Sequence, residues 1–297
     1  MHTKFFGTGV ALATPFHADF SVDYPALERL LEHVTAGGVD YLVVMGTTGE
    51  VPTVTKAERR EILRFVKQFN NGRLPIVYGA GGNATAELLE NVRETDFSGV
   101  DAVLSVSPYY NKPTQAGLVA HYEALAEACP VPVILYNVPG RTAANLNADS
   151  TLALARHPNI IGVKEASGDM MQGIDIARDK PSDFLFLAGD DMLMLPMTTF
   201  GAKGVISVLA NAFPQPFTRM VNAALSGDHE AAATHLFQLS PVNRLMYEEG
   251  NPVGVKSALQ TLGICGDVVR LPLLPASNAL SGRIRQAIAA MNATALA

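Results

Sequence analysis

The chain has 297 residues, of which 48% are hydrophobic, enough for a large buried core. Its formal net charge is -6, from 22 basic and 28 acidic residues, and it has no basic tract, so we expect no nucleic-acid partner. No segment approaches the roughly 18 consecutive apolar residues of a membrane span. Neither Cys129 nor Cys265 belongs to a C-x-x-C pair, which favours a cytoplasmic protein with reduced thiols over a disulfide-built domain.

The N-terminal stretch KFFGTGVALATPF, residues 4–16, allows two interpretations. A lysine, an apolar segment and an A-x-A sequence at 11–13 together resemble a short signal peptide with its cleavage site. The same residues also suit a buried first strand that ends at Pro15. We favour the strand because of a family resemblance described below.

Short apolar runs alternate along the chain with longer amphipathic segments. The runs are rich in Val, Ile or Leu and lack polar alternation, which is typical of parallel strands covered on both faces. The predicted strands are Thr8–Thr14, Tyr41–Met45, Ile76–Gly79, Ala102–Ser107, Val133–Tyr136, Ile160–Lys164, Phe184–Ala188 and Gly204–Ser207.

The segments between the strands have the apolar spacing of helices. Four clear examples are 24–38, 55–69, 83–97 and 114–128. The second begins with a capping box, in which Thr55 is followed three residues later by Glu58. Eight strand–helix units favour a closed (β/α)8 TIM barrel over an open doubly wound sheet.

After about residue 226 the strand patterns stop, and the segments 228–250 and 251–263 indicate helices only. We therefore assign residues 1–226 to a catalytic barrel and residues 227–297 to a small C-terminal helical region.

In a TIM barrel the functional side chains follow the carboxyl ends of the strands. The second strand is followed by GTTGE, residues 46–50, in which two glycines flank Thr47 and Thr48. A tight loop with free N–H groups and two hydroxyls suits a carboxylate. Taken alone, however, such a pentapeptide is more often an ordinary glycine turn.

Neither a nucleotide cofactor nor a metal is expected. The third strand ends in GAGGNA, residues 79–84, which matches the loose dinucleotide pattern G-x-G-x-x-G/A. However, the match lies in the third unit, and no acid ends the next strand to bind a ribose. The seven histidines show no ligand spacing such as H-x-x-x-H.

Aromatic and basic residues follow the fourth and fifth strands. SPYYNKP, residues 107–113, holds two tyrosines between prolines, which either pack at a subunit contact or reach a site. Tyr136 ends the fifth strand, so its hydroxyl points to the barrel mouth. Arg141 follows on a Pro-Gly turn, where a guanidinium can bind a carboxylate, although a lone arginine is more often a surface residue.

Lys164 ends the sixth strand, and a lysine is almost never fully buried unless it is paired or used. Neighbouring residues on a strand face opposite ways, which disfavours a pair with Glu165. If Val163 packs on the helices, Lys164 points into the barrel. Desolvation lowers the pKa of a lysine, and the neutral amine can then form a Schiff base with a carbonyl substrate.

The segments GTTGE, YYNKP, YNVPGRT and GVKEASG, in this order and spacing, resemble the dihydrodipicolinate synthase (4-hydroxy-tetrahydrodipicolinate synthase) family, from about Phe6 to about Gly263. The opening GTGVALATPF is also similar to the first strand of that family. The resemblance implies a lyase of lysine and diaminopimelate biosynthesis that condenses pyruvate with L-aspartate-4-semialdehyde. It further implies a covalent lysine Schiff base without another cofactor, and a cytoplasmic homo-oligomer, either a dimer or a dimer of dimers.

The resemblance assigns catalytic roles residue by residue. It makes Lys164 the Schiff-base lysine. It places Tyr136, Thr47 and Tyr110 in a proton relay, with Tyr110 arriving from the neighbouring subunit.

Substrate binding is also implied by the resemblance. Thr48 is expected to hold the pyruvate carboxylate, and Arg141 the carboxylate of the semialdehyde. Gly189 and Ile206 are expected to line the pyruvate pocket through backbone groups.

Many members of the family are inhibited by lysine at a dimer interface. Asn83, Glu87 and Tyr109 match the positions that would hold the inhibitor. Lys56 and Arg59 stand where sensitive relatives often carry histidines. Because like charges repel at close range, we expect weak or absent feedback by lysine.

Two other functions remain open. N-acetylneuraminate lyase and keto-deoxy-sugar-acid aldolases or dehydratases share Lys164, Tyr136 and a G-[ST]-T-G-E loop, but generally lack the Arg141 clamp. A barrel that only binds a small acid, or serves as an assembly partner, would be expected to have lost some of Lys164, Tyr136, Thr47 or Arg141. All four are present.

Overall fold

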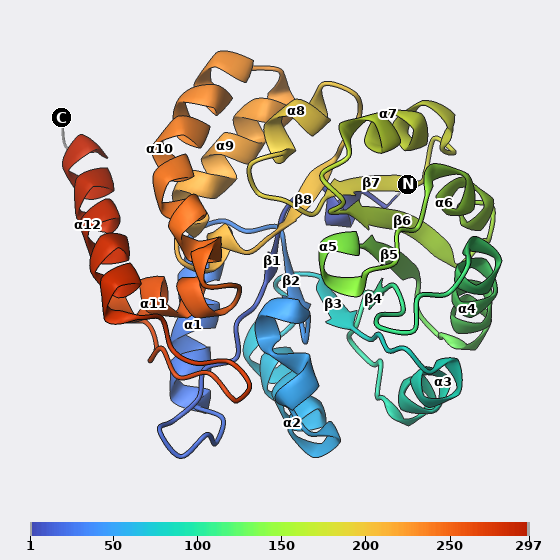
Figure 1. Ribbon diagram of the computed structural model, residues 1–297, viewed down its shortest axis with the longest axis horizontal. Helices are drawn as coiled ribbons and strands as arrows, with labels where there is room; N and C mark the ends of the chain where they lie inside the picture. Colours follow the sequence, from blue (N-terminus) through green and yellow to red (C-terminus); the bar gives the residue numbers. More distant parts are fainter. Residues whose placement is uncertain (1, 296–297) are drawn as a thin grey trace. The chain divides into compact units, whose positions relative to one another are not determined.

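The structure is a computed structural model that describes residues 2–295, with side chains up to residue 291. Within these residues eight strands form one closed parallel barrel in chain order, which confirms the predicted TIM barrel (Figure 1). The strands are β1 Gly7–Ala11, β2 Tyr41–Val44, β3 Ile76–Gly79, β4 Ala102–Val106, β5 Val133–Asn137, β6 Ile160–Glu165, β7 Leu185–Ala188 and β8 Gly204–Ser207.

Helices follow the strands, and all four that the sequence predicted between strands are present as α1 to α4. The α-helices are α1 Tyr24–Ala36, α2 Lys56–Asn70, α3 Thr85–Glu94, α4 Gln115–Ala128, α5 Pro139–Thr142, α6 Ala148–Leu154, α7 Met170–Asp179, α8 Met194–Thr198, α9 Pro214–Ser226, α10 His229–Glu248, α11 Val253–Thr261 and α12 Asn278–Ala295. The 3-10 helices are η1 Thr3–Phe5, η2 Thr47–Gly49, η3 Val51–Thr53 and η4 Leu209–Asn211.

The capping box at the start of α2 forms as the sequence predicts. The Thr55 hydroxyl accepts a hydrogen bond from the Glu58 N–H at 3.2 Å, and the Glu58 carboxylate accepts one from the Thr55 N–H at 2.8 Å. Two N–H groups that have no partner within the helix are satisfied in this way, which sets where α2 begins.

The first strand is shorter than predicted, because it ends at Ala11 and not at Thr14. The Asn211 side chain donates to the Ala11 carbonyl at 2.8 Å and accepts from the Ala13 N–H at 3.0 Å. A side chain distant in sequence thus replaces the ladder hydrogen bonds, and the backbone leaves the sheet while its polar groups stay paired.

The chain divides into two compact units. The first contains residues 2–9, 40–43 and 74–206. In it, α3, α4, α6 and α7 lie outside the strands β3 to β7 (Figure 1). Every residue of β5, β6 and β7 and all of β4 except Val106 is buried, so these runs form the core without a polar alternation.

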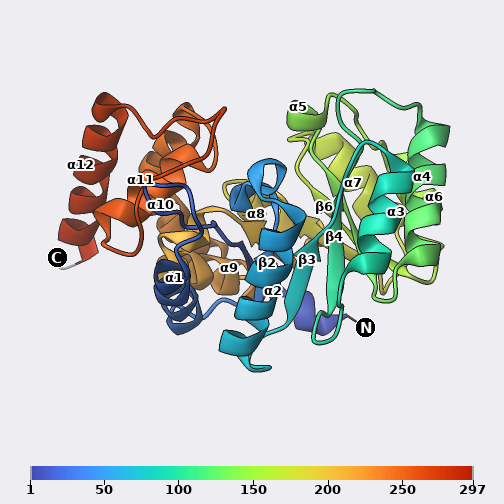
Figure 2. The ribbon, with the colours of Figure 1, turned by 90° about the horizontal axis from the view of Figure 1, so that it is seen from below.

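The second unit contains residues 10–39, 44–73 and 207–295. It includes α1, α2 and α9, and α10, α11 and α12 pack against one another (Figure 2). The helices predicted after residue 226 are therefore present, while the boundary between a barrel of residues 1–226 and a helical region of residues 227–297 remains a proposal. Within the described part of the chain, every helix is too short or too polar to cross a membrane.

Candidate active site

Lys164 and Tyr136 lie side by side on the same face of the sheet. They are register partners on the parallel strands β6 and β5, and such partners point the same way. Lys164 is only 4% exposed, and its ammonium nitrogen lies 4.3 Å from the centroid of the Tyr136 ring. Among the described residues none forms a hydrogen bond or ion pair with this nitrogen. The strand ends thus present a buried amine against a phenol ring.

Glu165, the next residue on β6, turns its carboxylate to other partners. It accepts hydrogen bonds from the side-chain amides of Asn137 and Gln172, both at 3.1 Å, and from the Ser167 N–H at 2.6 Å. The alternation of the strand therefore turns the two side chains apart, as the sequence predicted, and Glu165 forms no ion pair with Lys164.

The amide partners of Glu165 continue into a network that the sequence did not predict. Asn137 donates to the Asn145 side chain at 2.8 Å and accepts from the Leu146 N–H at 2.9 Å. Asn145 in turn donates to Gln172 at 2.8 Å. The network joins the ends of β5 and β6 to the segment before α6 and to α7, so it holds the two strand ends that carry the phenol and the amine.

This network is expected to contribute to stability. Glu165→Leu removes one acceptor from each of the buried Asn137 and Gln172 amides, and each buried donor left unsatisfied costs about 1–3 kcal/mol. We therefore expect the free energy of unfolding to fall by about 3 kcal/mol in urea titrations. Glu123→Leu, on the exposed face of α4, serves as the control. Equal stability of the two variants would contradict a structural role for the network.

Arg141 and Tyr110 lie in neighbouring segments of the first unit. Arg141 is exposed on α5, and its N–H donates to the Val138 carbonyl at 2.9 Å. Tyr110 is 87% exposed, has a φ of 75°, and donates its N–H to the Thr142 carbonyl of α5 at 3.4 Å. A left-handed tyrosine is strained and persists where its surroundings hold it, which is frequent at functional sites.

Gly189 and Ile206 also lie at or near the carboxyl ends of strands. Gly189 comes directly after β7, and its N–H donates to the Glu165 carbonyl at 2.7 Å. A Cβ at position 189 would lie 2.5 Å from the Cβ of Ala166, so only glycine permits this approach. Ile206 is a buried residue of β8.

In the second unit, the GTTGE loop forms the 3-10 helix η2. The buried Thr48 hydroxyl accepts a hydrogen bond from the Asn251 amide at 3.1 Å. The Gly49 carbonyl accepts another from the Thr14 hydroxyl at 2.8 Å. Residues from two distant segments therefore hold the loop, which makes an ordinary flexible turn a poor description of it.

Three of the candidate regulatory residues, Asn83, Glu87 and Tyr109, belong to the first unit. The Asn83 carbonyl accepts a hydrogen bond from the Asn111 side chain at 2.8 Å, in the loop that also carries Tyr109. Glu87 is exposed in the first turn of α3.

Of the two cations in the second unit, Lys56 is exposed at the start of α2. Arg59 donates from its guanidinium to the carbonyls of Val51 at 2.7 Å and Val54 at 2.9 Å. Its positive charge is therefore held in place by the backbone that follows GTTGE.

Neither metal ligands nor a disulfide are found in the part of the chain that the structure describes. No group of three or more His, Cys, Asp or Glu side chains there could hold a metal ion. Cys129 and Cys265 are both buried free thiols, and burial raises the pKa of each; that of Cys265 rises to about 11.

A closed parallel barrel with a buried amine beside a phenol at its strand ends has the arrangement of a (β/α)8 enzyme. The profile of the Dihydrodipicolinate synthetase family matches residues 4–291. The chain therefore belongs to this family.

Relatives agree over nearly the full chain. A protein named 4-hydroxy-tetrahydrodipicolinate synthase from Cytophaga hutchinsonii is 51% identical over 287 residues, covering 97% of this chain and 96% of its own. The chloride-inhibited dihydrodipicolinate synthase from Acinetobacter baumannii, solved in complex with pyruvate, superposes with a TM-score of 0.94 at 37% identity, covering 97% of this chain and 99% of its own. The dihydrodipicolinate synthase from Cyanidioschyzon merolae, solved with lysine bound, gives 0.93, also at 37% identity and with the same coverage.

Proposed function

We propose that this protein condenses pyruvate with L-aspartate-4-semialdehyde to give 4-hydroxy-tetrahydrodipicolinate, in lysine and diaminopimelate biosynthesis. The observation that carries the proposal is the buried Lys164 amine against Tyr136, in a chain of this family. The name shared by its relatives and the pyruvate complex of the A. baumannii relative support the choice of substrates.

The chemistry starts from the neutral amine of Lys164, which attacks the ketone carbon of pyruvate and expels water to form an imine. Loss of a methyl proton converts the imine to an enamine, whose terminal carbon adds to the aldehyde of the second substrate. The amine of that substrate then attacks the imine carbon. This closes the ring and releases the Lys164 amine, so no further cofactor is required.

Each of these steps moves a proton, and acid–base groups must stand close to the reacting atoms. We assign this relay to the hydroxyls of Tyr136, Thr47 and Tyr110. Its supporting observation is that the ring of Tyr136 lies 4.3 Å from the Lys164 amine.

Two carboxylates must also be bound. We assign the pyruvate carboxylate to Thr48 in the GTTGE loop, and that of the semialdehyde to Arg141, whose guanidinium can bind it in a bidentate manner. Gly189 and Ile206, at the ends of β7 and β8, are assigned to the wall of the pyruvate pocket through their backbone groups.

We further propose that the protein works as a homo-oligomer, a dimer or a dimer of dimers, in the cytoplasm. The strained and exposed Tyr110 supports self-association, since a large aromatic side chain that contacts little of its own protomer can pack against a neighbouring copy. The two free thiols fit a reducing compartment.

A coupled assay tests the proposed reaction. Purified protein receives pyruvate, L-aspartate-4-semialdehyde and excess dihydrodipicolinate reductase, and the loss of NADPH is followed. Clear turnover supports the proposal. If no turnover occurs while borohydride still traps pyruvate on Lys164, the second substrate is instead a sugar-acid aldehyde, as in the related lyases.

Feedback by lysine is expected to be weak. The residues proposed to hold an inhibitor include Asn83, Glu87 and Tyr109, but Lys56 and Arg59 add positive charge that repels a lysine ammonium. Such repulsion amounts to about 1 kcal/mol for two charges about 4 Å apart in water, a factor of about five in affinity. Inhibition of the coupled assay by micromolar lysine would show this expectation wrong.

A pair of single variants tests whether the charge of Lys56 weakens inhibition by lysine. Lys56→His is expected to lower the half-inhibitory lysine concentration about fivefold, because it removes one repelling charge at neutral pH. Arg60→His, which changes an exposed cation elsewhere on α2, should leave it unchanged.

A further inference from the structure

The second unit contains a buried ion pair that the proposed reaction does not use. The Lys256 ammonium on α11 lies 2.5 Å from the carboxylate of Glu50, the last residue of the GTTGE loop. The side chains are 0% and 1% exposed, respectively. Removing two charges from water costs several kilocalories per mole per ion after relaxation, so a buried pair is a poor device for stability alone.

Both members of the pair are fully engaged. Lys256 also donates to the Val268 carbonyl at 2.7 Å and lies 4.2 Å from the centroid of the Phe16 ring. The second oxygen of Glu50 accepts the Arg270 N–H at 3.0 Å. Burial lowers the pKa of Lys256, and the Glu50 carboxylate opposes this shift and holds the charged form.

The Lys256–Glu50 ion pair holds one end of a loop whose backbone is strained. Glu50 has a φ of 56° and Met45 a φ of 61°, so left-handed residues other than glycine stand on both sides of Gly46, Thr47, Thr48 and Gly49. Such backbone persists only where its surroundings determine it. The Glu50 carboxylate is the contact that ties the strained residue at the end of the loop to α11.

The same short stretch of chain reaches the loop at a second point. Asn251 precedes α11 and donates to the Thr48 hydroxyl at 3.1 Å, while Lys256 on α11 holds Glu50. Two residues five positions apart thus fix the hydroxyl that we assign to the substrate carboxylate and the end of the loop that presents it.

We propose that Lys256 is a positioning residue for the substrate carboxylate: through Glu50 it keeps residues 46–50 in the strained shape whose N–H groups and hydroxyls bind an α-keto acid. This inference rests on the proposed function, since it assumes that the loop receives the carboxylate of pyruvate. The ketone carbon of pyruvate does not depend on this loop, because it reacts with the amine of Lys164. Loss of the ion pair should therefore weaken recognition of the carboxylate and leave reaction with a simple ketone intact.

The test uses the double variant Lys256→Met with Glu50→Gln, which removes both charges and leaves neither one buried alone. Borohydride trapping on Lys164 is followed by mass spectrometry over a range of pyruvate concentrations. It is repeated with hydroxyacetone, a ketone without a carboxylate. Thermal unfolding followed by circular dichroism monitors the fold.

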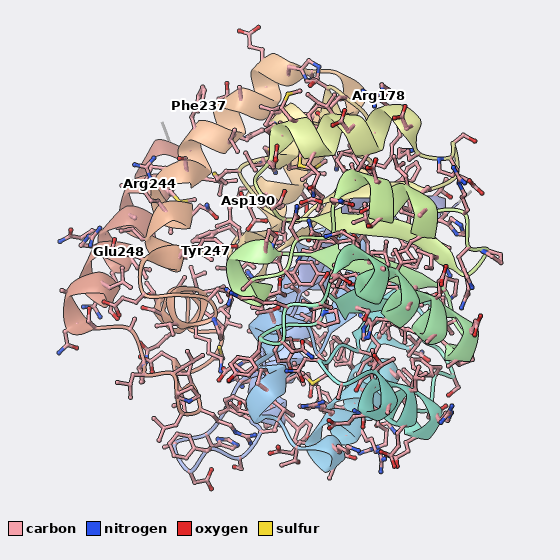
Figure 3. All side chains as sticks on the ribbon, turned by 45° about the vertical axis from the view of Figure 1, so that its right-hand side comes forward. Arg178, Asp190, Phe237, Arg244, Tyr247 and Glu248 are labelled. Atoms are coloured by element: carbon pink, nitrogen blue, oxygen red, sulfur yellow. The ribbon has the colours of Figure 1, made fainter. Side chains whose placement is uncertain are left out.

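We expect the half-saturating pyruvate concentration to rise about tenfold, the scale of one hydrogen bond to a charged group. That for hydroxyacetone should change less than about twofold. The control is Arg283→Met, which breaks an exposed ion pair with Glu248 on α10, labelled in Figure 3. It should bind both ketones like the parent protein, since exposed pairs contribute little.

Three results overturn the inference: unchanged pyruvate saturation in the double variant, equal losses for both ketones, or a double variant that does not fold, because the pair would then serve only to hold the structure. Failure of the proposed function looks different. In that case the parent protein itself is not trapped by pyruvate on Lys164.

Discussion

Replacement of Lys164 with alanine is expected to reduce turnover by about a thousandfold or more, because the imine that carries every later step has no amine to form on. The fold should remain intact. In the described structure no hydrogen bond or ion pair of the Lys164 side-chain nitrogen is lost, so the substitution leaves no buried partner unsatisfied.

The coupled assay measures turnover of Lys164→Ala, and borohydride trapping with pyruvate measures imine formation. Lys180→Ala is the control, since the half-buried amine of Lys180 donates to the Phe184 carbonyl at 2.9 Å and has no role in the proposed chemistry. Turnover at the parent rate in Lys164→Ala, or labelling at another lysine, would refute the central role of this residue.

The second large effect is expected for Tyr136→Phe. The ring that covers the Lys164 amine remains, while the hydroxyl that we assign to proton transfer is lost. General acid–base groups contribute about 10²–10⁴ in rate, so turnover should fall at least about a hundredfold. Pyruvate should still be trapped on Lys164, more slowly.

Tyr122→Phe provides a matched control. Its buried hydroxyl donates to the Ser105 carbonyl at 3.0 Å, outside the proposed chemistry. Its loss should cost about 1 kcal/mol of stability and leave turnover within about twofold. If Tyr136→Phe behaves in the same way, with lower stability and near-parental turnover, its hydroxyl transfers no proton.

Strand positions and strand ends could be predicted because they depend on local pattern. A run of Val, Ile and Leu covered on both faces is visible in the sequence, and the side chain at its carboxyl end must face the barrel mouth. Lys164 stood out because a lysine at the end of such a run conflicts with its surroundings. The end of β1 was wrong because Asn211, two hundred residues away, competes for the backbone of Ala11 and Ala13.

The same argument applied to Lys164 could have identified Lys256, which stands among apolar residues in VGVKSAL, residues 253–259. It was missed because most helices have an exposed face where a lysine can reach water, and the pattern does not reveal that residues 253–259 of this helix are all buried. The network around Glu165 had no comparable signal, since Asn137, Asn145 and Gln172 are ordinary polar residues until they are brought together.

By itself, then, the sequence determined the barrel and the order of its strands, and it indicated the strand-end loops to which we assign the chemistry, because periodicity and the chemistry of strand ends act over a few residues. Only the tertiary structure decided which groups hold those loops in shape. The partners of Glu50, Glu165 and Thr48 come from distant segments, and long-range pairs between single polar side chains leave no periodic trace in the chain.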